Sequence, residues 1–522
     1  MRFDQALNFF YSARISYPLF SRLRINSLDK VLTMPTEWHQ HKSSGELAGE
    51  VNNGVGKVVQ TTEGLSRELL PALIQTGFSL VPLVIFTPRT MPLLLVSAAV
   101  FIWLTILEQK QRQPYAKSRY RNYNRDYGYF TESFQAVQPI VQYGQSAHVL
   151  ERYNRIQRQI MTDGLTEARL ASRFGFRRNL IISAARRACQ CIWIWQYRHH
   201  TVDAAMIMYL NMLTEQLLGS CAGYASLIER IYEGVEPSRA LEQLLEDQPA
   251  LADQPDARTV DAPDLMEIRI RNASFTYPKR RTPVLRDFNL HLAPGRVLGI
   301  VGRSGCGKTT IHNVLTRVFD VQEGAVEICG IDVRLWPLDQ LRASFSYVSQ
   351  NGGVFFSGMT ILDVIRFTRP EASPADVVNA AETAAIHDEI CRLPQKYDTV
   401  IGEGAMTLSK GQQQRIALAQ ALIAMDDRRR ILILDEFTSA LDSETEERIL
   451  RKLEPWLEGR TVIIIAHRLS TVRKLADEIV VLDETGIVEQ GTHSELLALD
   501  GWYAEMARLQ DVGHAVPAPI MA

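Results

Sequence analysis

The distribution of apolar positions divides the chain into two parts with different periods. Residues 69–87 and 90–107 carry no charged side chain, are separated only by Pro88 and Arg89, and approach the length that crosses a bilayer as a helix. Beyond residue 266 the apolar runs are short and β-branched and alternate with amphipathic segments, which is typical of strands covered on both faces. The sequence therefore predicts a helical membrane hairpin followed by an α/β domain with a mostly parallel sheet.

A cluster of basic residues after the second apolar stretch predicts which side of the membrane the hairpin ends face. Cytosolic segments next to membrane helices are enriched in lysine and arginine, so both outer ends of the hairpin are expected in the cytosol. The alternative is a buried hairpin of a soluble helical domain, which satisfies the same length test. The basic residues are Lys110, Arg112, Lys117, Arg119, Arg121 and Arg125.

Two later apolar segments are weaker candidates for membrane spans. Arg186 and Arg187 interrupt residues 180–197, and Glu215 interrupts residues 204–228. Two arginines near a helix centre cost about 5 to 7 kcal/mol on insertion scales, so residues 180–197 are not expected to insert alone. Within the folded protein these arginines are expected to face a hydrated cavity or to reach toward the membrane boundary.

Composition narrows the classes of protein and the domain boundaries. A net charge of -2 argues against a nucleic-acid binder, which usually carries a basic excess. Six cysteines without C-x-x-C spacing fit a reducing cytosol, and the N-terminus lacks the pattern of a secretory signal.

An acidic, proline-containing stretch separates the two halves of the chain and is typical of a linker. The expected units are a transmembrane domain over 1–236, a linker over 237–265, the α/β domain over 266–510 and a tail over 511–522.

A glycine-rich loop follows the predicted strand at 297–301 and opens a helix. It fits G-x-x-x-x-G-K-[ST], a loop whose backbone N–H groups surround phosphate oxygens at a helix N-terminus. Lys308 is expected to reach the β- and γ-phosphates of ATP, and Thr309 to bind Mg²⁺. Cys306 is expected to fill space. The nucleotide-binding residues predicted here are Gly302, Arg303, Ser304, Gly305, Cys306, Gly307, Lys308, Thr309 and Thr310.

A second element supplies the acidic groups that ATP hydrolysis needs. The apolar run at 431–434 leads directly into Asp435 and Glu436. Asp435 is expected to hold Mg²⁺, and Glu436 to polarise the attacking water.

The segment from Leu408, with the letters LSKGQQQRIALA, resembles the signature of the ABC family. The resemblance implies an α-helical transmembrane domain followed by an α/β ABC-type P-loop ATPase domain, and two such domains that pair head to tail around ATP and Mg²⁺. This segment departs from the commonest ABC signature at Lys410, and the Lys410 side chain is expected to point to solvent. By the same resemblance Tyr277 stacks on adenine, Gln350 senses the γ-phosphate and binds the metal, and His467 is the switch histidine. Ser409, Gly411, Gln412 and Asp442 complete the implied nucleotide contacts.

Further stretches are similar to exporters of this family. Residues 399–404, with Glu403, resemble the segment that touches the intracellular loops of a partner subunit, and residues 44–47 and 132–153 resemble intracellular loops themselves. The resemblance implies an integral protein of the plasma or inner membrane with a cytoplasmic ATP-binding domain, contacting membrane lipid, a second half-transporter (identical or different) and an unidentified exported substrate. Residues before position 40 hold no span, so the first one or two transmembrane helices are expected to be lacking.

Two other functions remain as alternatives. A truncated or degenerate exporter could act as a soluble or peripheral ABC ATPase with a mechanical or regulatory role. An inactive docking subunit is disfavoured, because Lys308, Glu436 and His467 are all present. The sequence leaves lipid, drug, peptide and glycan substrates open.

Overall fold

The computed structural model describes residues 11–34, 36–39, 43–247, 253–260, 266–278, 280–303, 305–349, 352–402, 406–425, 429–484 and 486–513. The chain forms two compact units, Met1–Ala250 and Leu251–Ala522, which are described separately.

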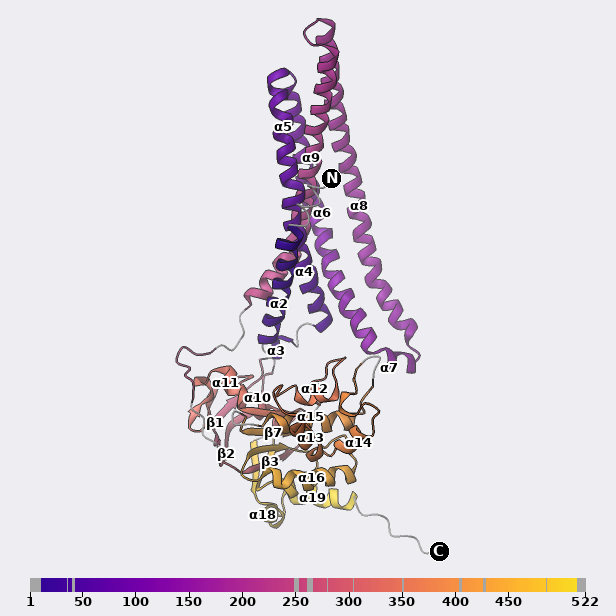
Figure 1. Ribbon diagram of the computed structural model, residues 1–522. Helices are drawn as coiled ribbons and strands as arrows, with labels where there is room; N and C mark the ends of the chain where they lie inside the picture. The colour runs from indigo at the N-terminus through magenta and orange to yellow at the C-terminus, as the bar shows by residue number, and fades with distance from the viewer. Residues whose placement is uncertain are drawn as a thin grey trace. The chain divides into compact units, whose positions relative to one another are not determined.

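The first unit is entirely helical in its described part. Helix α4 continues without a break through a π-helical turn, η2, into α5, and the turn to α6 lies at the same end of the unit as the turn between α8 and α9 (Figure 1). The short helix α7 lies at the opposite end (Figure 1). The elements are η1 (Ser12–Ser16), α2 (Tyr17–Thr33), α3 (Thr36–His39), α4 (Ser44–Gly64), η2 (Leu65–Leu69), α5 (Leu70–Phe86), α6 (Met91–Gln135), α7 (Val137–Gln142), α8 (Ser146–Arg198) and α9 (Ala204–Glu246).

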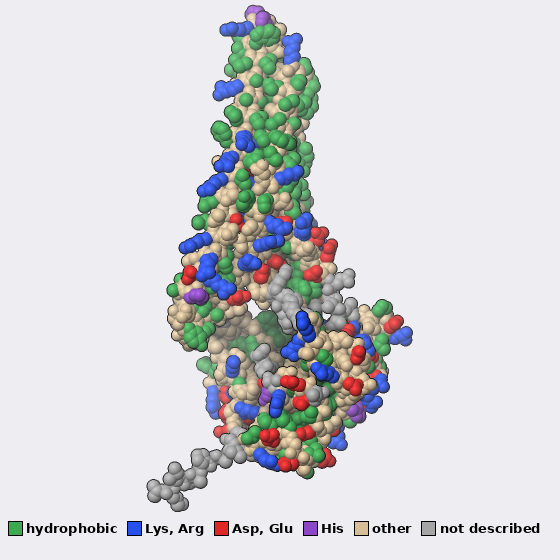
Figure 2. Space-filling model, turned by 180° about the vertical axis from the view of Figure 1, so that it is seen from behind, with side chains coloured by type: hydrophobic (Ala, Val, Ile, Leu, Met, Phe, Trp, Pro, Cys, Tyr) green, Lys and Arg blue, Asp and Glu red, His purple; other side chains and the backbone are tan. Residues whose placement is uncertain are grey.

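The predicted membrane hairpin corresponds to α5 and the first part of α6. Two continuous helices, Ser44–Phe86 and Met91–Gln135, are long and apolar enough to cross a bilayer, and only 17% and 39% of their most apolar windows are buried. Phe78 and Trp103, for example, are exposed. Figure 2 shows hydrophobic side chains over this end of the unit, with acidic ones toward the other. Exposed apolar helices of this kind fit a lipid-facing hairpin better than the core of a soluble domain.

Two of the three charges that interrupt the later apolar segments pair with each other in the fold. Arg186 on α8 lies 2.9 Å from Glu215 on α9, so the hairpin itself neutralises both charges. The expectation that Arg186 faces a hydrated cavity or the membrane boundary stays a prediction. Farther along, Glu108 is almost fully buried and its carboxylate is 2.8 Å from Arg178. Such ion pairs hold α6, α8 and α9 together, because separating them would leave unpaired buried charge.

The predicted boundary of the first unit needs a correction. Helix α9 continues through Pro237 to Glu246, so the beginning of the expected linker is helical. The helix continues because this part of it is buried: Leu241 and Leu244 pack with Leu47 and Val55 of α4.

The second unit contains two sheets. A six-stranded sheet has the order β10-β9-β3-β8-β7-β6, with parallel pairing except at the edge strand β10. A four-stranded antiparallel sheet has the order β2-β1-β4-β5. The strands are β1 (Ile268–Phe275), β2 (Leu285–Leu292), β3 (Val297–Gly302), β4 (Glu323–Ile328), β5 (Ile331–Asp332), β6 (Phe345–Val348), β7 (Ile431–Asp435), β8 (Thr461–Ile465), β9 (Glu478–Asp483) and β10 (Gly486–Gly491).

The apolar runs at 297–301 and 431–434 form strands, as predicted, and are β3 and β7. Helices cover this sheet, and the last of them, α19, extends past the predicted end of the domain at residue 510, so the expected tail begins within a helix. The helices are α10 (Lys308–Leu315), η3 (Val333–Leu335), α11 (Leu338–Ala343), α12 (Ile361–Arg366), α13 (Pro374–Thr383), α14 (His387–Cys391), η4 (Lys396–Asp398), α15 (Lys410–Ala424), α16 (Ser443–Leu457), α17 (Leu469–Leu475), α18 (His493–Ala498) and α19 (Trp502–Gly513).

Candidate functional site

The predicted catalytic groups meet at one edge of the six-stranded sheet. Strands β3, β8 and β7 are parallel neighbours, so their carboxyl ends lie side by side. The glycine-rich loop follows β3, the acidic pair ends β7 and His467 follows β8. Ligands of open parallel sheets bind outside such carboxyl ends.

The backbone of the glycine-rich loop has a positive φ at Gly302, Gly305 and Gly307, a conformation that favours glycine. A Cβ at Gly302 would collide with the carbonyl of Leu482. Gly307 has φ +103° and directly precedes α10. The buried ammonium of Lys308 donates hydrogen bonds to the carbonyls of Gly302 at 2.8 Å and Arg303 at 2.9 Å. The loop therefore holds its lysine at the N-terminus of a helix, as a phosphate site requires.

Cys306 and Thr309 occupy different environments in the same loop. Cys306 is buried, and burial raises the pKa of its thiol while Lys308 opposes the shift. This agrees with the space-filling role expected of it. Thr309 is exposed in the first turn of α10, and its role as a metal ligand stays a prediction.

Asp435 is buried at the end of β7 and is held by a tyrosine. The hydroxyl of Tyr347 donates to Asp435 Oδ2 at 3.2 Å. Burial raises the pKa of Asp435, and the hydrogen bond from Tyr347 and the charge of Lys308 oppose this. A buried carboxylate at this edge of the sheet suits a metal ligand, because a bound cation would offset the cost of its desolvation.

Glu436 has an unusual backbone and a direct contact with His467. Its φ is +48°, a left-handed conformation that costs free energy in a residue other than glycine. Its N–H donates to the carbonyl of Ile465 at 2.9 Å, which fixes β7 to the end of β8. The Glu436 Oε1 atom lies 2.7 Å from His467 Nε2. The strained backbone therefore aims the carboxylate at the histidine.

Tyr277 reaches the helix that follows the loop. Its hydroxyl shares a 3.0 Å hydrogen bond with Thr310 and accepts one from Asn313 at 3.3 Å. The ring packs edge-on against Phe275 and Phe319. This places the half-buried tyrosine beside the phosphate loop, and its stacking on adenine stays a prediction.

The signature segment forms a capped helix start. Ser409 caps α15 by accepting from the N–H of Gln412 at 3.2 Å, and the Gln412 side chain accepts from the N–H of Ser409 at 2.9 Å. Lys410 is exposed at the first helical position, as expected. A Cβ at Gly411 would lie 3.2 Å from the carbonyl of Ala440, so this turn packs tightly on the loop after β7. In the part of the chain that the structure describes, the side chains of Ser409 and Gln412 each accept a hydrogen bond from the other's backbone N–H. The Gln412 side chain also donates to Glu389 of α14.

Four further predicted residues have no described contact with this cluster, three of them because they are not described. Asp442 caps α16 by accepting from the N–H of Thr445 at 2.9 Å, which lowers the pKa of its carboxyl. Ser304, Gln350 and Glu403 lie outside the described residues. The roles predicted for these four residues stay predictions.

Sequence reasoning missed three residues that support the site. They are Tyr347, which holds Asp435, Gln414, and Gln510. The Gln414 amide donates to the carbonyl of Glu436 at 3.3 Å and to the hydroxyl of Ser439 at 2.8 Å. The run of three glutamines in the signature was the available signal for Gln414, whereas neither Tyr347 nor Gln510 stands in any motif.

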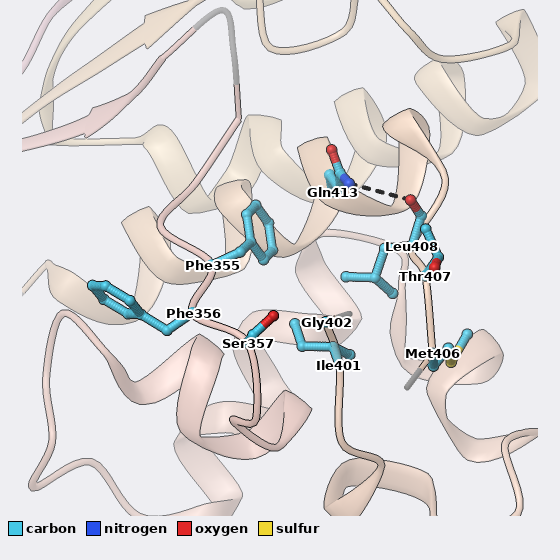
Figure 3. A pocket seen from close by; sticks show the side chains of 9 residues that line it. All are labelled: Phe355, Phe356, Ser357, Ile401, Gly402, Met406, Thr407, Leu408 and Gln413. Carbon is cyan, nitrogen blue, oxygen red and sulfur yellow. Dashed lines mark hydrogen bonds between the residues drawn. The ribbon is translucent and has the colours of Figure 1, made fainter. Parts of the chain in front are cut away.

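A pocket of about 220 Å³ lies beside the start of α15 (Figure 3). The segment after β6 contributes Phe355, Phe356 and Ser357, and the segment before α15 contributes Ile401 and Leu408, among others. Its lining is mainly apolar and Phe356 is exposed. It is therefore a surface on which an apolar helix could pack.

The glycine-rich loop, the paired acids and the histidine define a P-loop ATPase domain, here joined to a helical membrane domain. Comparison with protein families agrees: a model described as ABC transporter matches residues 285–439, and one described as ABC transporter transmembrane region matches residues 6–221. The chain belongs to the ABC transporter family and has the fused arrangement of an exporter-type half-transporter.

Individual relatives support the same assignment. An ATP-dependent lipid A-core flippase of Yersinia pestis is 46% identical over 245 residues, 47% of this chain and 41% of the relative, so this match spans about two fifths of the flippase. The flippase of Pseudomonas putida is 29% identical over 98% of this chain and 82% of its own length. A bacterial Atm1-family ABC exporter with ATP bound superposes with a TM-score of 0.89 at 27% identity, covering 99% of this chain and 88% of that one.

These matches decide two earlier expectations. The chain is an integral membrane protein with a cytoplasmic ATP-binding domain, which rules out the soluble or peripheral alternative. The expected lack of the first one or two transmembrane helices is not supported, because the transmembrane family model matches from residue 6.

Proposed function

We propose that the chain is one subunit of a dimeric exporter that uses ATP hydrolysis to move a substrate across a membrane. The observation that carries this proposal is the 2.7 Å contact between Glu436 and His467, next to the phosphate loop at the ends of adjacent strands. A base oriented by a second side chain, close to a phosphate cradle, is what hydrolysis of a phosphoanhydride requires.

Each residue at the sheet edge has a role in this proposal. Lys308 and the N–H groups of the loop bind the phosphates, and Glu436 orients the attacking water. Thr309 and Asp435 would hold Mg²⁺ together with Gln350, and the ion would neutralise charge on the β- and γ-phosphates. The buried Asp435, kept in place by Tyr347, fits this ligand role. His467 holds the Glu436 carboxylate and reaches the γ-phosphate.

The proposed partner is a second ABC half-transporter. Ser409, Gly411 and Gln412 cluster at the exposed N-terminus of α15, where helix N–H groups favour a bound phosphate. A partner's ATP would supply that phosphate. The pocket in Figure 3 offers an apolar surface of matching character to α7, whose Val137 and Val141 are exposed. We therefore assign the pocket to contact with an intracellular loop of the partner.

We propose a lipid as the substrate class. The support is the similarity over nearly the whole chain to a relative named as a lipid A-core flippase. Exposed apolar side chains along α5 and α6 would also let a lipid approach from the bilayer.

The test uses the full-length protein in lipid vesicles. ATP turnover is measured with and without added lipid, drug, peptide or glycan. Glu436→Gln should abolish turnover while ATP still binds, because the phosphate cradle is intact. Glu444→Gln, an exposed glutamate in the first turn of α16, is the matched control and should behave like wild type. Retained turnover in Glu436→Gln would refute the assignment of the base.

A further inference from the structure

The loop that carries His467 is held by the last helix of the domain. The Gln510 side chain on α19 accepts a hydrogen bond from the N–H of Leu469 at 2.9 Å. The same side chain donates to the carbonyl of His467 at 3.0 Å. One amide therefore bridges both backbone positions that flank Arg468.

Local sequence explains why this bridge is needed. Leu469 opens α17, and the N–H groups in the first turn of a helix have no partner within it. A serine, threonine or aspartate before the helix would usually satisfy one of them, but Arg468 makes no such bond. Its guanidinium instead reaches Glu446 and the carbonyl of Leu441. Gln510 supplies the missing cap from a distant part of the chain.

The bridge lies close to the reacting groups. The His467 ring is 47% exposed, and it contacts Glu436 through Nε2. A pocket of about 320 Å³ lies between the loops that contain Arg303 and His467 and the residues of α19, which include Met506. The hydrogen bonds of Gln510 act on the backbone beside this space and constrain the carbonyl of His467 directly.

We propose that Gln510 is a positioning residue for hydrolysis: it fixes the backbone of His467 so that the imidazole stays on the Glu436 carboxylate. The inference rests on the proposed ATPase function and adds α19 to the elements that control it. Displacement of α19 would release His467 without disturbing the phosphate loop.

The experiment compares variants of the full-length protein in lipid vesicles by steady-state and single-turnover ATP hydrolysis. Gln510→Met keeps the length of the side chain and removes both hydrogen bonds. We expect kcat to fall about tenfold, about 1.4 kcal/mol in the activation barrier, with an unchanged KM for ATP. Gln510→Glu keeps the acceptor for Leu469 but loses the donor to His467, and should also lower kcat.

Two controls separate positioning from a general structural effect. Arg508→Gln, on the same helix, breaks only an exposed ion pair with Asp500 and should leave kcat unchanged. In a His467→Ala background, Gln510→Met should cause no further loss, because the residue acts through His467.

The outcomes are distinct. Wild-type kcat in Gln510→Met, or an equal further loss in the His467→Ala background, would overturn the positioning role while leaving the proposed function intact. Absence of ATP turnover in the wild-type protein would overturn the proposed function and, with it, this inference. We expect Gln510→Met to lower kcat and, because the cap of α17 is lost, to lower the melting temperature by only a few degrees, so that the variant stays folded in the assay.

Discussion

Glu389→Gln should destabilise the ATP-binding domain by removing the brace behind the signature helix. The buried Arg415 donates to both Glu389 oxygens, at 2.6 and 3.0 Å, and to the carbonyl of Ala385 at 2.9 Å. Gln412 of the signature donates to the same carboxylate at 3.1 Å. The substitution leaves the guanidinium buried without its counter-charge.

The size of the effect follows from the exposure of the two side chains. Breaking a fully buried ion pair costs about 3 to 5 kcal/mol. Arg415 is 8% exposed but Glu389 is 35% exposed, so water can partly replace the lost carboxylate. We therefore expect about 2 kcal/mol, within the range for hydrogen bonds to charged groups. For a domain of this size that lowers the melting temperature by about 4 to 8 °C.

The same pair predicts a dependence on pH. Burial raises the pKa of Glu389, but the hydrogen bonds from Arg415 and Gln412 outweigh it, so the pKa lies below its usual value. A lowered folded-state pKa gives stability that is fully present above the unfolded value, about 4.3, and is lost as the pH falls through the folded value. The difference between wild type and Glu389→Gln should thus be constant near neutral pH and narrow in acid.

Thermal unfolding of the detergent-solubilised protein measures both effects. Arg451→Gln is the matched control, because it breaks an exposed pair with Glu447, with side chains 72% and 46% exposed. Such pairs contribute less than about 1 kcal/mol. If Glu389→Gln melts no lower than Arg451→Gln, the brace contributes nothing and the reasoning is refuted.

Two other substitutions test the nucleotide site. Tyr347→Phe removes the hydrogen bond that opposes the raised pKa of Asp435, so Mg²⁺ should be needed at about tenfold higher concentration, for about 1.4 kcal/mol. A Mg²⁺ titration of ATP turnover measures this, and unchanged dependence would contradict it. Tyr277→Ala should raise the KM for ATP with little change in kcat, because a stacking contact stabilises ground and transition states equally. A lower kcat at unchanged KM would count against the adenine role.

Most of the site could be predicted from the sequence, because its residues belong to short contiguous motifs. The glycine-rich loop, Asp435 and Glu436 each belong to one strand end, so their chemistry follows from neighbouring residues. Parallel pairing then brings those ends together. The sequence also located the hairpin of α5 and α6, since unbroken apolar runs need no partner to be recognised.

The remainder depended on contacts between distant residues. Gln510 meets His467 across 43 positions and Tyr347 meets Asp435 across 88, and no local pattern encodes either contact. The charges of Arg186 and Glu215 argued against membrane helices when taken singly, and only the α8–α9 hairpin shows them paired. The antiparallel sheet was missed because β1 and β2 alternate buried and exposed positions and form no continuous apolar run.

Mixing two inactive variants tests the central claim most directly, which is that each ATP lies between the phosphate loop of one subunit and the signature of another. Lys308→Ala disables the loop and Ser409→Arg the signature, so each should be inactive alone. In a mixed dimer one composite site combines the intact loop of one chain with the intact signature of the other, and ATP turnover should return. Turnover by Ser409→Arg alone, or a mixture as inactive as its components, would contradict the account.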